Sequence, residues 1–350
     1  MTLKKWIMAF LILSMVLLVG FAAFQYAADP LLQFRPESGF LTAYKYLDIY
    51  SNPGIARQYE YDAVMVGTSM IENTVVPECN ELFDCNMVRL SYSGGSAYNM
   101  KRILDICFDR EQTPKTVFWS LDEHQIISGW DQPRYPLPEY LYDQTLEGNL
   151  SYLLNLDIFY NFTYPDILMT RNGVHQKAAP EGESWSGDFS KAAMMHSYDR
   201  PAQADELVGL THFQETVQEN LDNNILPLIR ENPETEFKFI FVPYSILYWD
   251  KEMRQGTFDA LMYSVEHTVK TLLQYDNVHV YFYHDWWDVV LNLDNYKDYS
   301  HYGKWINSAI MQRVAQGEGE LTDENYVQKF KEMSEFIHSY DFENLFADEK

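Results

Sequence analysis

The chain has 350 residues, of which 47% are hydrophobic and 16% aromatic, and its formal net charge at pH 7 is −25. A surface this acidic repels phosphate backbones and anionic lipid headgroups, which excludes nucleic acid as a partner. The hydrophobic content is that of a globular protein, and the length fits one large α/β domain with insertions or more than one domain.

An apolar segment at residues 1–28 is predicted to be a membrane anchor. Lys4 and Lys5 come first, and the next 23 residues carry no charge. A helix of that length crosses a hydrocarbon core of about 30 Å. A cleaved signal peptide is the alternative, but its apolar stretch is shorter, and Tyr26 is bulky for a cleavage site after residue 28. The lysines predict an inside N-terminus and an extracytoplasmic location for the rest of the chain.

Residues 29–60 are irregular, and we interpret them as a linker that leads into the main domain. From residue 61, short apolar runs alternate with helical spacing. Such a pattern is typical of a mostly parallel sheet covered on both faces. Five strands are expected at 63–66, 87–90, 115–121, 236–245 and 278–283. Helices are expected at 97–109, 257–275, 303–315 and 323–339, the last with Thr322 as its N-cap.

This alternation breaks at about 125–205, which contains QPRYPLPEY, NFTYPD and EGESWSGDFS. We interpret the stretch as an insertion, partly helical around 146–160. Sites in such sheets form outside the carboxyl ends of the strands, so an insertion after the third strand is expected to overhang the site. The sequence therefore predicts one α/β domain over 61–318, followed by a C-terminal helix and acidic tail at 319–350.

The three cysteines do not make a full disulfide framework. Cys79 and Cys85 bracket a short loop that a disulfide can bridge, whereas Cys107 lies in a predicted helix and is expected to pack as a small apolar residue. No CxxC spacing typical of a metal site is present.

Two glycine-containing strand ends carry groups suited to acyl chemistry. Gly67-Thr68-Ser69 follows the first strand, where glycine permits a sharp turn that points the serine hydroxyl out of the sheet edge. Gly94 and Gly95, in SGGS after the second strand, allow backbone N–H groups to point outward, as a developing oxyanion requires. Each feature taken alone also fits an ordinary turn.

A third feature is Asp298-Tyr299-Ser300-His301, which precedes a predicted helix. An Asp three residues before a His can lie on the same side of one helical turn. Its carboxylate then holds the imidazole Nδ1–H and leaves Nε2 free to take a proton from a serine. Helix capping by Asp298 is the structural alternative.

Other polar residues near the strand ends are interpreted as the wall of a substrate pocket. They are Gly95, Asp122, His124, Tyr244 and His284. Asp122 with His124 is a rival acid–base pair, and a cation site in HDWWD or at Asp294 with the Asp298–His301 pair is a weaker alternative. We predict no metal and no cofactor.

Together, Gly67-Thr68-Ser69, Gly94 and Asp298-x-x-His301 resemble three blocks of the SGNH/GDSL hydrolase superfamily, over roughly residues 60–315. The resemblance implies a flavodoxin-like three-layer sandwich with a mostly parallel five-stranded sheet. It makes Ser69 the nucleophile, His301 the base and Asp298 the orienting acid, with the N–H groups of Ser69 and Gly94 as the oxyanion hole.

The match departs from the family pattern in two places. GTSM replaces GDSL, and no GxND block is found, since the third strand ends in SLDEH at 120–124. The third oxyanion donor is therefore unassigned. An α/β-hydrolase is a weaker alternative, because Ser69 lacks the glycine two residues later that GxSxG requires.

With its N-terminal anchor, the chain is similar to exported SGNH-like proteins that act with membrane-bound O-acyltransferases, such as the alginate O-acetylation proteins and the D-alanyl-lipoteichoic-acid biosynthesis protein. The resemblance implies an extracytoplasmic serine esterase or O-acyltransferase that acts on small acyl esters, such as acetyl, of an envelope polysaccharide or teichoic-acid-like polymer. A catalytically degenerate scaffold or binding protein in an envelope polymer-modification complex is the alternative.

Overall fold

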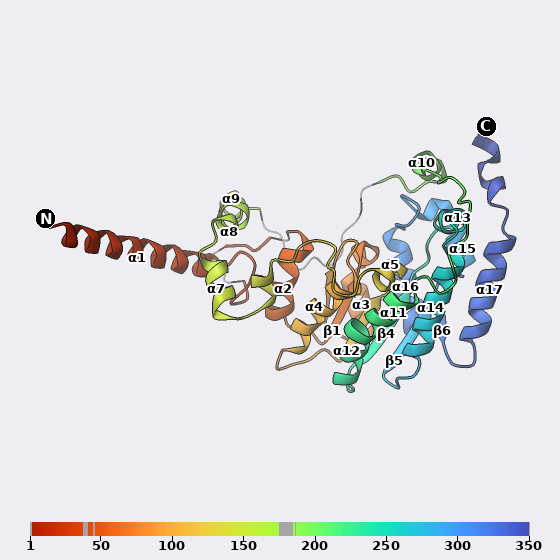
Figure 1. Cartoon of the computed structure of the whole chain (residues 1–350), viewed down its shortest axis with the longest axis horizontal. Coiled ribbons are helices and arrows are strands. Elements are labelled where there is room, and N and C mark those ends of the chain that lie inside the picture. The colour runs from red at the N-terminus through yellow and green to blue at the C-terminus, as the bar shows by residue number, and fades with distance from the viewer. Residues whose placement is uncertain (1, 38–40, 45, 175–184, 186, 350) are drawn as a thin grey trace. The chain divides into compact units, whose positions relative to one another are not determined.

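The computed structural model describes the whole chain except residues 1, 38–40, 45, 175–184, 186 and 350 (Figure 1). The chain divides into two compact units, each built from two separate stretches of sequence. Unit 1 comprises residues 1–60 and 135–180, and unit 2 comprises residues 61–134 and 181–350. Unit 1 contains the N-terminal helix, and unit 2 contains the sheet.

Helix α1 (Leu3–Ala28) is long and apolar enough to cross a membrane, with a mean hydropathy of 2.7. Its side chains are largely exposed as far as Gly20, and only its C-terminal end packs against the rest of unit 1. There the rings of Phe21 and Phe24 contact Phe159, with centroids 5.9 and 6.3 Å apart.

The rest of unit 1 is made of short helices. They are α2 (Asp48–Gln58), α6 (Glu139–Tyr142), α7 (Leu146–Leu153), α8 (Leu156–Ile158), the π-helical turn η2 (Phe159–Thr163) and α9 (Tyr164–Arg171). Asp29 joins α1 to this group, because its buried carboxylate accepts the N–H of Gln33 and the hydroxyl hydrogen of Tyr152.

Unit 2 is built on a six-stranded sheet of order β2-β1-β3-β4-β5-β6. Its strands are β1 (Ala63–Gly67), β2 (Met87–Ser91), β3 (Thr116–Ser120), β4 (Glu236–Phe241), β5 (Val278–Phe282) and β6 (Glu320–Leu321). The first five are parallel, and β6 pairs antiparallel with β5. A five-stranded sheet was predicted, and β6 was missed because two residues show no periodicity.

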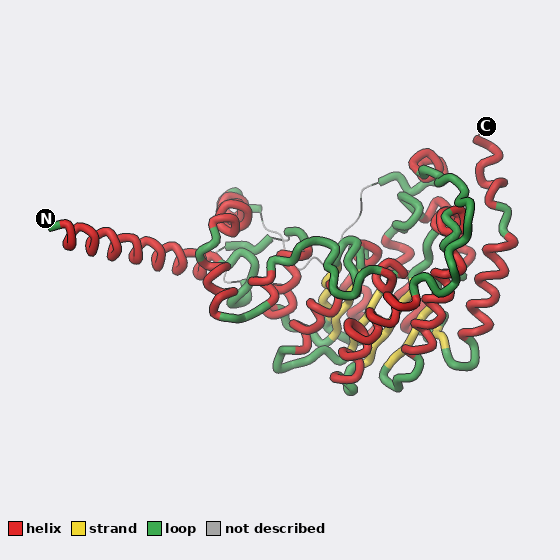
Figure 2. The backbone as a smooth tube through the Cα atoms, in the orientation of Figure 1, coloured by secondary structure: helices red, strands yellow, loops and turns green. Residues whose placement is uncertain are grey.

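Helices flank the sheet, as its apolar strands require, since β1 and β2 are buried along their whole length (Figure 2). Those before β4 are η1 (Ser69–Ile71), α3 (Val76–Phe83), α4 (Ala97–Phe108), α5 (Glu123–Ile127), α10 (Lys191–Ser197), α11 (Gln214–Asn220), η3 (Leu221–Ile225) and α12 (Leu226–Glu231). Those after β4 are α13 (Ile246–Arg254), α14 (Phe258–Leu272), α15 (Trp287–Val290), η4 (Leu293–Asn295), α16 (Lys304–Ala315), α17 (Tyr326–Ser339) and η5 (Phe342–Glu349).

Two local predictions need correction. Helix α17 begins at Tyr326 with Asn325 at its N-cap, so Thr322 does not cap it. Cys79 and Cys85 do not form the disulfide that the sequence allowed, because both are free thiols. Cys107 is buried in α4, as predicted, and burial raises the pKa of its thiol to about 12.

Candidate active site

The carboxyl ends of three neighbouring strands bring the candidate residues to one edge of the sheet. β1 lies between β2 and β3, with Gly67 opposite Ser91 and Val66 opposite Trp119. The segments that carry Ser69, Gly94 and Asp122 therefore leave the sheet at the same end.

Gly67 is required by close packing between β1 and β3. A Cβ placed there would lie 2.8 Å from the Cβ of Ser120, closer than real side chains approach. Thr68 follows in an extended conformation and caps η1 by accepting the N–H of Met70 at 3.4 Å. Its hydroxyl donates to the carboxylate of Asp122. Ser69 thus opens a short helical turn whose start is tied to β3.

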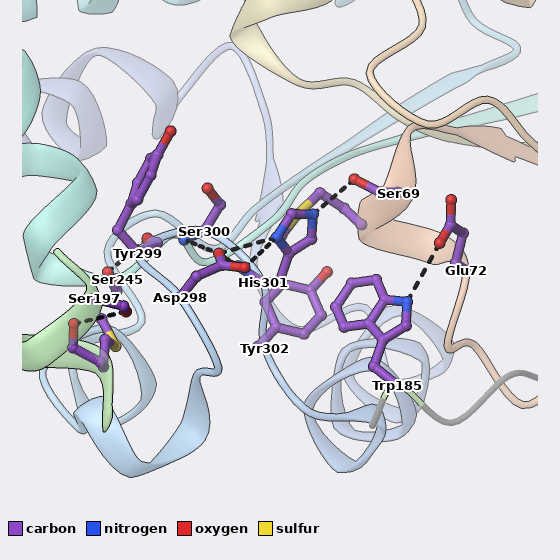
Figure 3. Close-up of polar contacts among 12 residues, drawn as sticks. Ser69, Glu72, Trp185, Ser197, Ser245, Asp298, Tyr299, Ser300, His301 and Tyr302 are labelled. Carbon is purple, nitrogen blue, oxygen red and sulfur yellow. Dashed lines mark hydrogen bonds and ion pairs between the residues drawn. The ribbon is translucent and has the colours of Figure 1, made fainter. Parts of the chain in front are cut away.

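Ser69, His301 and Asp298 form a continuous chain of hydrogen bonds (Figure 3). The Ser69 Oγ lies 2.8 Å from His301 Nε2, and His301 Nδ1 lies 2.8 and 2.9 Å from the two carboxylate oxygens of Asp298. With Nδ1–H donating to the carboxylate, Nε2 is left to accept the serine proton. The side chains of His301 and Asp298 are 26% and 36% exposed, so this chain of groups is open to a ligand.

Asp298 and His301 lie in a tight loop and not on the helical turn that their spacing suggested. The loop is closed by a bridge between Tyr296 and Tyr302 and by the Lys297 N–H, which donates to the His301 carbonyl at 2.9 Å. Asp298 also accepts the backbone N–H of His301 at 2.9 Å. Acid and base are therefore fixed by the same few residues, before α16 begins.

The electrostatics of Asp298 favour its ionised form. Burial by itself raises the pKa of the carboxyl group, but the hydrogen bond and charge of His301 and two backbone N–H groups outweigh it. The pKa of Asp298 is therefore held below its usual range, and the group is a carboxylate at neutral pH.

The backbone after β2 offers a second donor. Gly94 has φ +63°, a conformation that favours glycine, and the N–H of Gly95 is used within the turn, where it donates to Tyr92 at 2.8 Å. The N–H groups of Ser69 and Gly94, in contrast, donate to no acceptor among the described residues. Both are therefore available to an oxyanion, whereas Gly95 is buried and has a structural role.

Three residues assigned to the pocket wall lie instead in the interior, beneath the site. Asp122, Tyr244 and His284 are buried, so they are not placed to contact a substrate. Asp122 accepts from Thr68, and burial raises the pKa of its carboxyl group to about 6. The Tyr244 ring stacks on Tyr248 with centroids 4.2 Å apart. These side chains are buried because each makes its contacts within the protein, Asp122 with Thr68, Tyr244 with Tyr248 and His284 with the Val242 carbonyl.

His284 faces Glu123, a residue that the sequence analysis did not single out. Nε2 and the Glu123 carboxylate oxygen Oε1 lie 2.5 Å apart, although not in the line that a hydrogen bond requires. The contact is a buried histidine–carboxylate pair, because both side chains are almost fully excluded from solvent. Four aromatic rings surround the imidazole: Phe241, Tyr244, Trp249 and Phe282.

The two other kinds of site that the sequence allowed, an Asp122–His124 acid–base pair and a cation site, lack among the described residues the contacts that they require. His124 is exposed and contacts the Ser128 hydroxyl at 3.4 Å, but the Asp122 carboxylate is engaged by Thr68, so the rival acid–base pair does not form. In HDWWD, Asp285 pairs with Lys329 at 2.8 Å. Within the described parts of the chain, no three His, Cys, Asp or Glu side chains converge as metal ligands.

Trp185 is a neighbour of the site that no sequence signal indicated. Its ring meets His301 edge-to-face, with centroids 4.7 Å apart (Figure 3). The indole N–H donates to Glu72 at 3.3 Å, and the Lys297 ammonium lies 4.3 Å from the ring centroid. The ring therefore limits the movement of the imidazole on one side.

Comparison with known proteins adds no assignment, because no family model, no curated protein and no solved structure matches this chain. The function therefore has to be argued from the geometry of the site.

Proposed function

We propose that the protein is a membrane-anchored serine esterase or O-acyltransferase of the SGNH/GDSL type. The observation that carries the proposal is the hydrogen-bonded chain from Ser69 through His301 to Asp298, at a solvent-accessible edge of the sheet. Serine, imidazole and carboxylate in this order are the groups that activate a hydroxyl for attack on an acyl ester.

In the proposed reaction, His301 Nε2 takes the proton of Ser69 as Oγ attacks the ester carbonyl. The N–H groups of Ser69 and Gly94 stabilise the oxyanion, and ionised Asp298 stabilises the imidazolium. The imidazolium then gives its proton to the departing alcohol, which leaves an acyl-serine. Water or an acceptor hydroxyl attacks that ester, again with His301 as base, and Ser69 recovers its proton. Hydrolysis and transfer differ only in this second nucleophile.

The sheet supports the family that we propose. Its parallel strands follow the order β2-β1-β3-β4-β5, which is the order of flavodoxin-like sheets, and the candidate residues leave its carboxyl edge. The antiparallel β6 is an addition to that plan.

The expected location of the site outside the cytoplasm limits the classes of substrate that it can meet. With α1 as an uncleaved anchor and Lys4 and Lys5 in its first turn, we propose that the site faces the extracytoplasmic side. We propose small acyl esters, such as acetyl esters, of an envelope polysaccharide or teichoic-acid-like polymer as substrates, and a membrane-bound O-acyltransferase as partner. The second candidate is a non-catalytic scaffold of the same fold, which is favoured by the lack of an Asn-containing block after β3.

A fluorophosphonate probe tests the proposal, because it labels only an activated serine. The wild-type chain should be labelled and Ser69→Ala should not. Ser128→Ala is a matched control, since Ser128 also contacts a histidine, His124, but one without a carboxylate partner. Loss of labelling in Ser69→Ala alone supports the enzyme. An unlabelled wild-type chain, or labelling that survives Ser69→Ala, overturns it in favour of the scaffold.

A further inference from the structure

Unit 1 exposes a set of large apolar side chains that its own core does not use. We call it the apolar belt, and its members are Leu146, Leu150, Leu154, Leu156, Tyr160, Tyr164 and Leu168. Each is between 39% and 77% exposed. Single exposed leucines are common, but seven within 23 consecutive residues are a pattern that indicates an interaction surface.

The spacing of the belt gathers these side chains on the outer faces of short helices. Leu146, Leu150 and Leu154 recur every four residues along α7 and at its C-cap, and Tyr160 and Tyr164 repeat the interval across η2 and α9. Residues four apart lie on one face of a helix. The opposite side of the same segment is buried, as Tyr152, Ile158 and Phe162 show, although these belong to the core of unit 1 and not to the belt.

The short helices that carry the belt lie beside the C-terminal end of α1 (Figure 1). The uncharged part of α1 begins at Trp6, after Lys4 and Lys5, and the 20 residues from Trp6 to Gln25 rise about 30 Å along a helix. That is the thickness of a hydrocarbon core, about 30 Å. Protein packing on α1 lies at the far end of this span, where Phe21 and Phe24 contact Phe159. Phe159 is thus at the depth where hydrocarbon gives way to headgroups, and it lies in the middle of the belt segment.

The charge of the segment identifies the kind of surface that it fits. Residues 146–168 contain no Lys or Arg, and their ionisable acids are Glu147, Asp157 and Asp166. Attraction to anionic headgroups is therefore excluded, and burial of apolar area is the remaining source of affinity. Leucine with exposed tyrosine is the composition that sits well at the boundary between acyl chains and headgroups.

From these observations we propose that the apolar belt lies in the outer interfacial layer of the membrane that α1 crosses, so that unit 1 is held by a spanning helix and an in-plane surface together. The proposal depends on α1 being a membrane span and goes beyond the proposed acyl chemistry, with which it shares no residue. The partner that covers the apolar belt is the lipid bilayer itself.

Depth measurements on the full chain in vesicles of zwitterionic phosphatidylcholine test this placement. The background is Cys85→Ser, because Cys79 and Cys107 are buried. An environment-sensitive fluorophore is attached at Leu150→Cys or Tyr160→Cys in the belt. Leu13→Cys in α1 and Val327→Cys, an exposed apolar position of unit 2, serve as references. Doxyl groups placed shallow or deep on the acyl chains quench the fluorophore according to its depth.

We expect the two belt labels to show blue-shifted emission and stronger quenching by the shallow doxyl than by the deep one. The label at position 13 should be quenched more by the deep doxyl, and the label at 327 by neither. Belt labels that behave like position 327 would overturn the interfacial placement and indicate a face reserved for another protein. An unquenched label at position 13 would overturn the anchor as well, whereas fluorophosphonate labelling of Ser69 tests the chemistry separately.

Discussion

Unit 2 holds several histidine–carboxylate pairs, and two of them, His301 with Asp298 and His284 with Glu123, differ in what surrounds them. His301 with Asp298 is partly open to solvent, and its free nitrogen meets Ser69. His284 with Glu123 is sealed among aromatic rings, and the Nδ1–H of His284 donates to the Val242 carbonyl oxygen, 2.8 Å away. Both pairs have the composition of an acid–base dyad. Solvent access and a neighbouring serine hydroxyl, and not composition, therefore distinguish the His301 pair from the His284 pair.

The largest effect is expected on the rate of ester hydrolysis when the partly exposed pair of His301 and Asp298 is changed. His301→Gln removes the base while preserving a polar side chain, and should lower the rate of ester hydrolysis by about 10⁴-fold. Steady-state assays with 4-nitrophenyl acetate measure this. His279→Gln is the control, because His279 also pairs with a carboxylate, Glu320, but at the other end of β5. Equal rates for the two variants would contradict the assignment of His301 as base.

A substitution in the buried pair of His284 and Glu123 should lower the free energy of unfolding and should not act directly on ester hydrolysis. Glu123→Gln leaves the buried His284 without its carboxylate partner, and removing one partner of such a buried pair costs about 3–5 kcal/mol of the free energy of unfolding. Urea unfolding measures the loss. The control is Glu320→Gln, whose pair with His279 is about one-third exposed and worth at most about 1 kcal/mol. A similar loss in both variants would remove the distinction between sealed and open pairs.

A smaller effect is expected at the hydrogen bond between Thr68, next to Ser69, and Asp122, next to Glu123. Thr68→Val removes the hydroxyl that bonds Asp122 and caps the turn of Ser69, which should destabilise the fold by about 1–3 kcal/mol. The same loss should lower kcat about tenfold with little change in KM, because the nucleophile is less well held. Thr68→Ser keeps the hydroxyl and should restore both values. If Thr68→Ser behaves like Thr68→Val, the lost methyl group and not the hydrogen bond is responsible.

The smallest effect concerns acid stability. The pKa of Asp298 is lower in the folded than in the unfolded chain, where an Asp carboxyl group titrates near about 3.9. Its contribution to stability is therefore fully present above about pH 4 and is lost as the pH falls through the folded value. The stability difference between wild type and Asp298→Asn should shrink in that window, as followed by urea unfolding at several pH values. A difference that is constant across the window would mean that the carboxylate is not preferentially ionised in the fold.

Local sequence carried a good part of the fold and of the site. The apolar strands β1 to β5 were recognisable because each is buried along most of its length. Asp298 and His301 were recognisable because they lie three positions apart in the sequence. Ser69 could be linked to them only by assuming that parallel strands end at one edge. The structure supplies that edge, with Ser69 and His301 in hydrogen-bond contact across 232 positions of sequence.

What the sequence did not reveal are contacts between distant positions that have no pattern. The burial of Asp122 depends on Thr68, and that of His284 on Glu123 and a set of rings from two strands and a helix. Trp185 reaches His301 from a polar stretch with no periodicity. The division into two units was equally hidden, because each unit is assembled from two separated stretches of chain.

That discontinuity has a consequence for biosynthesis. Phe21 of α1 is synthesised 138 residues before Phe159, against which it packs. At about 5–20 residues per second, the delay is of the order of ten seconds, so α1 is complete long before its packing partner exists. The strands β1 to β3 also emerge within this interval, between the two halves of unit 1. Synthesis of α1 therefore precedes completion of either unit, and both units fold after this long apolar helix has been made.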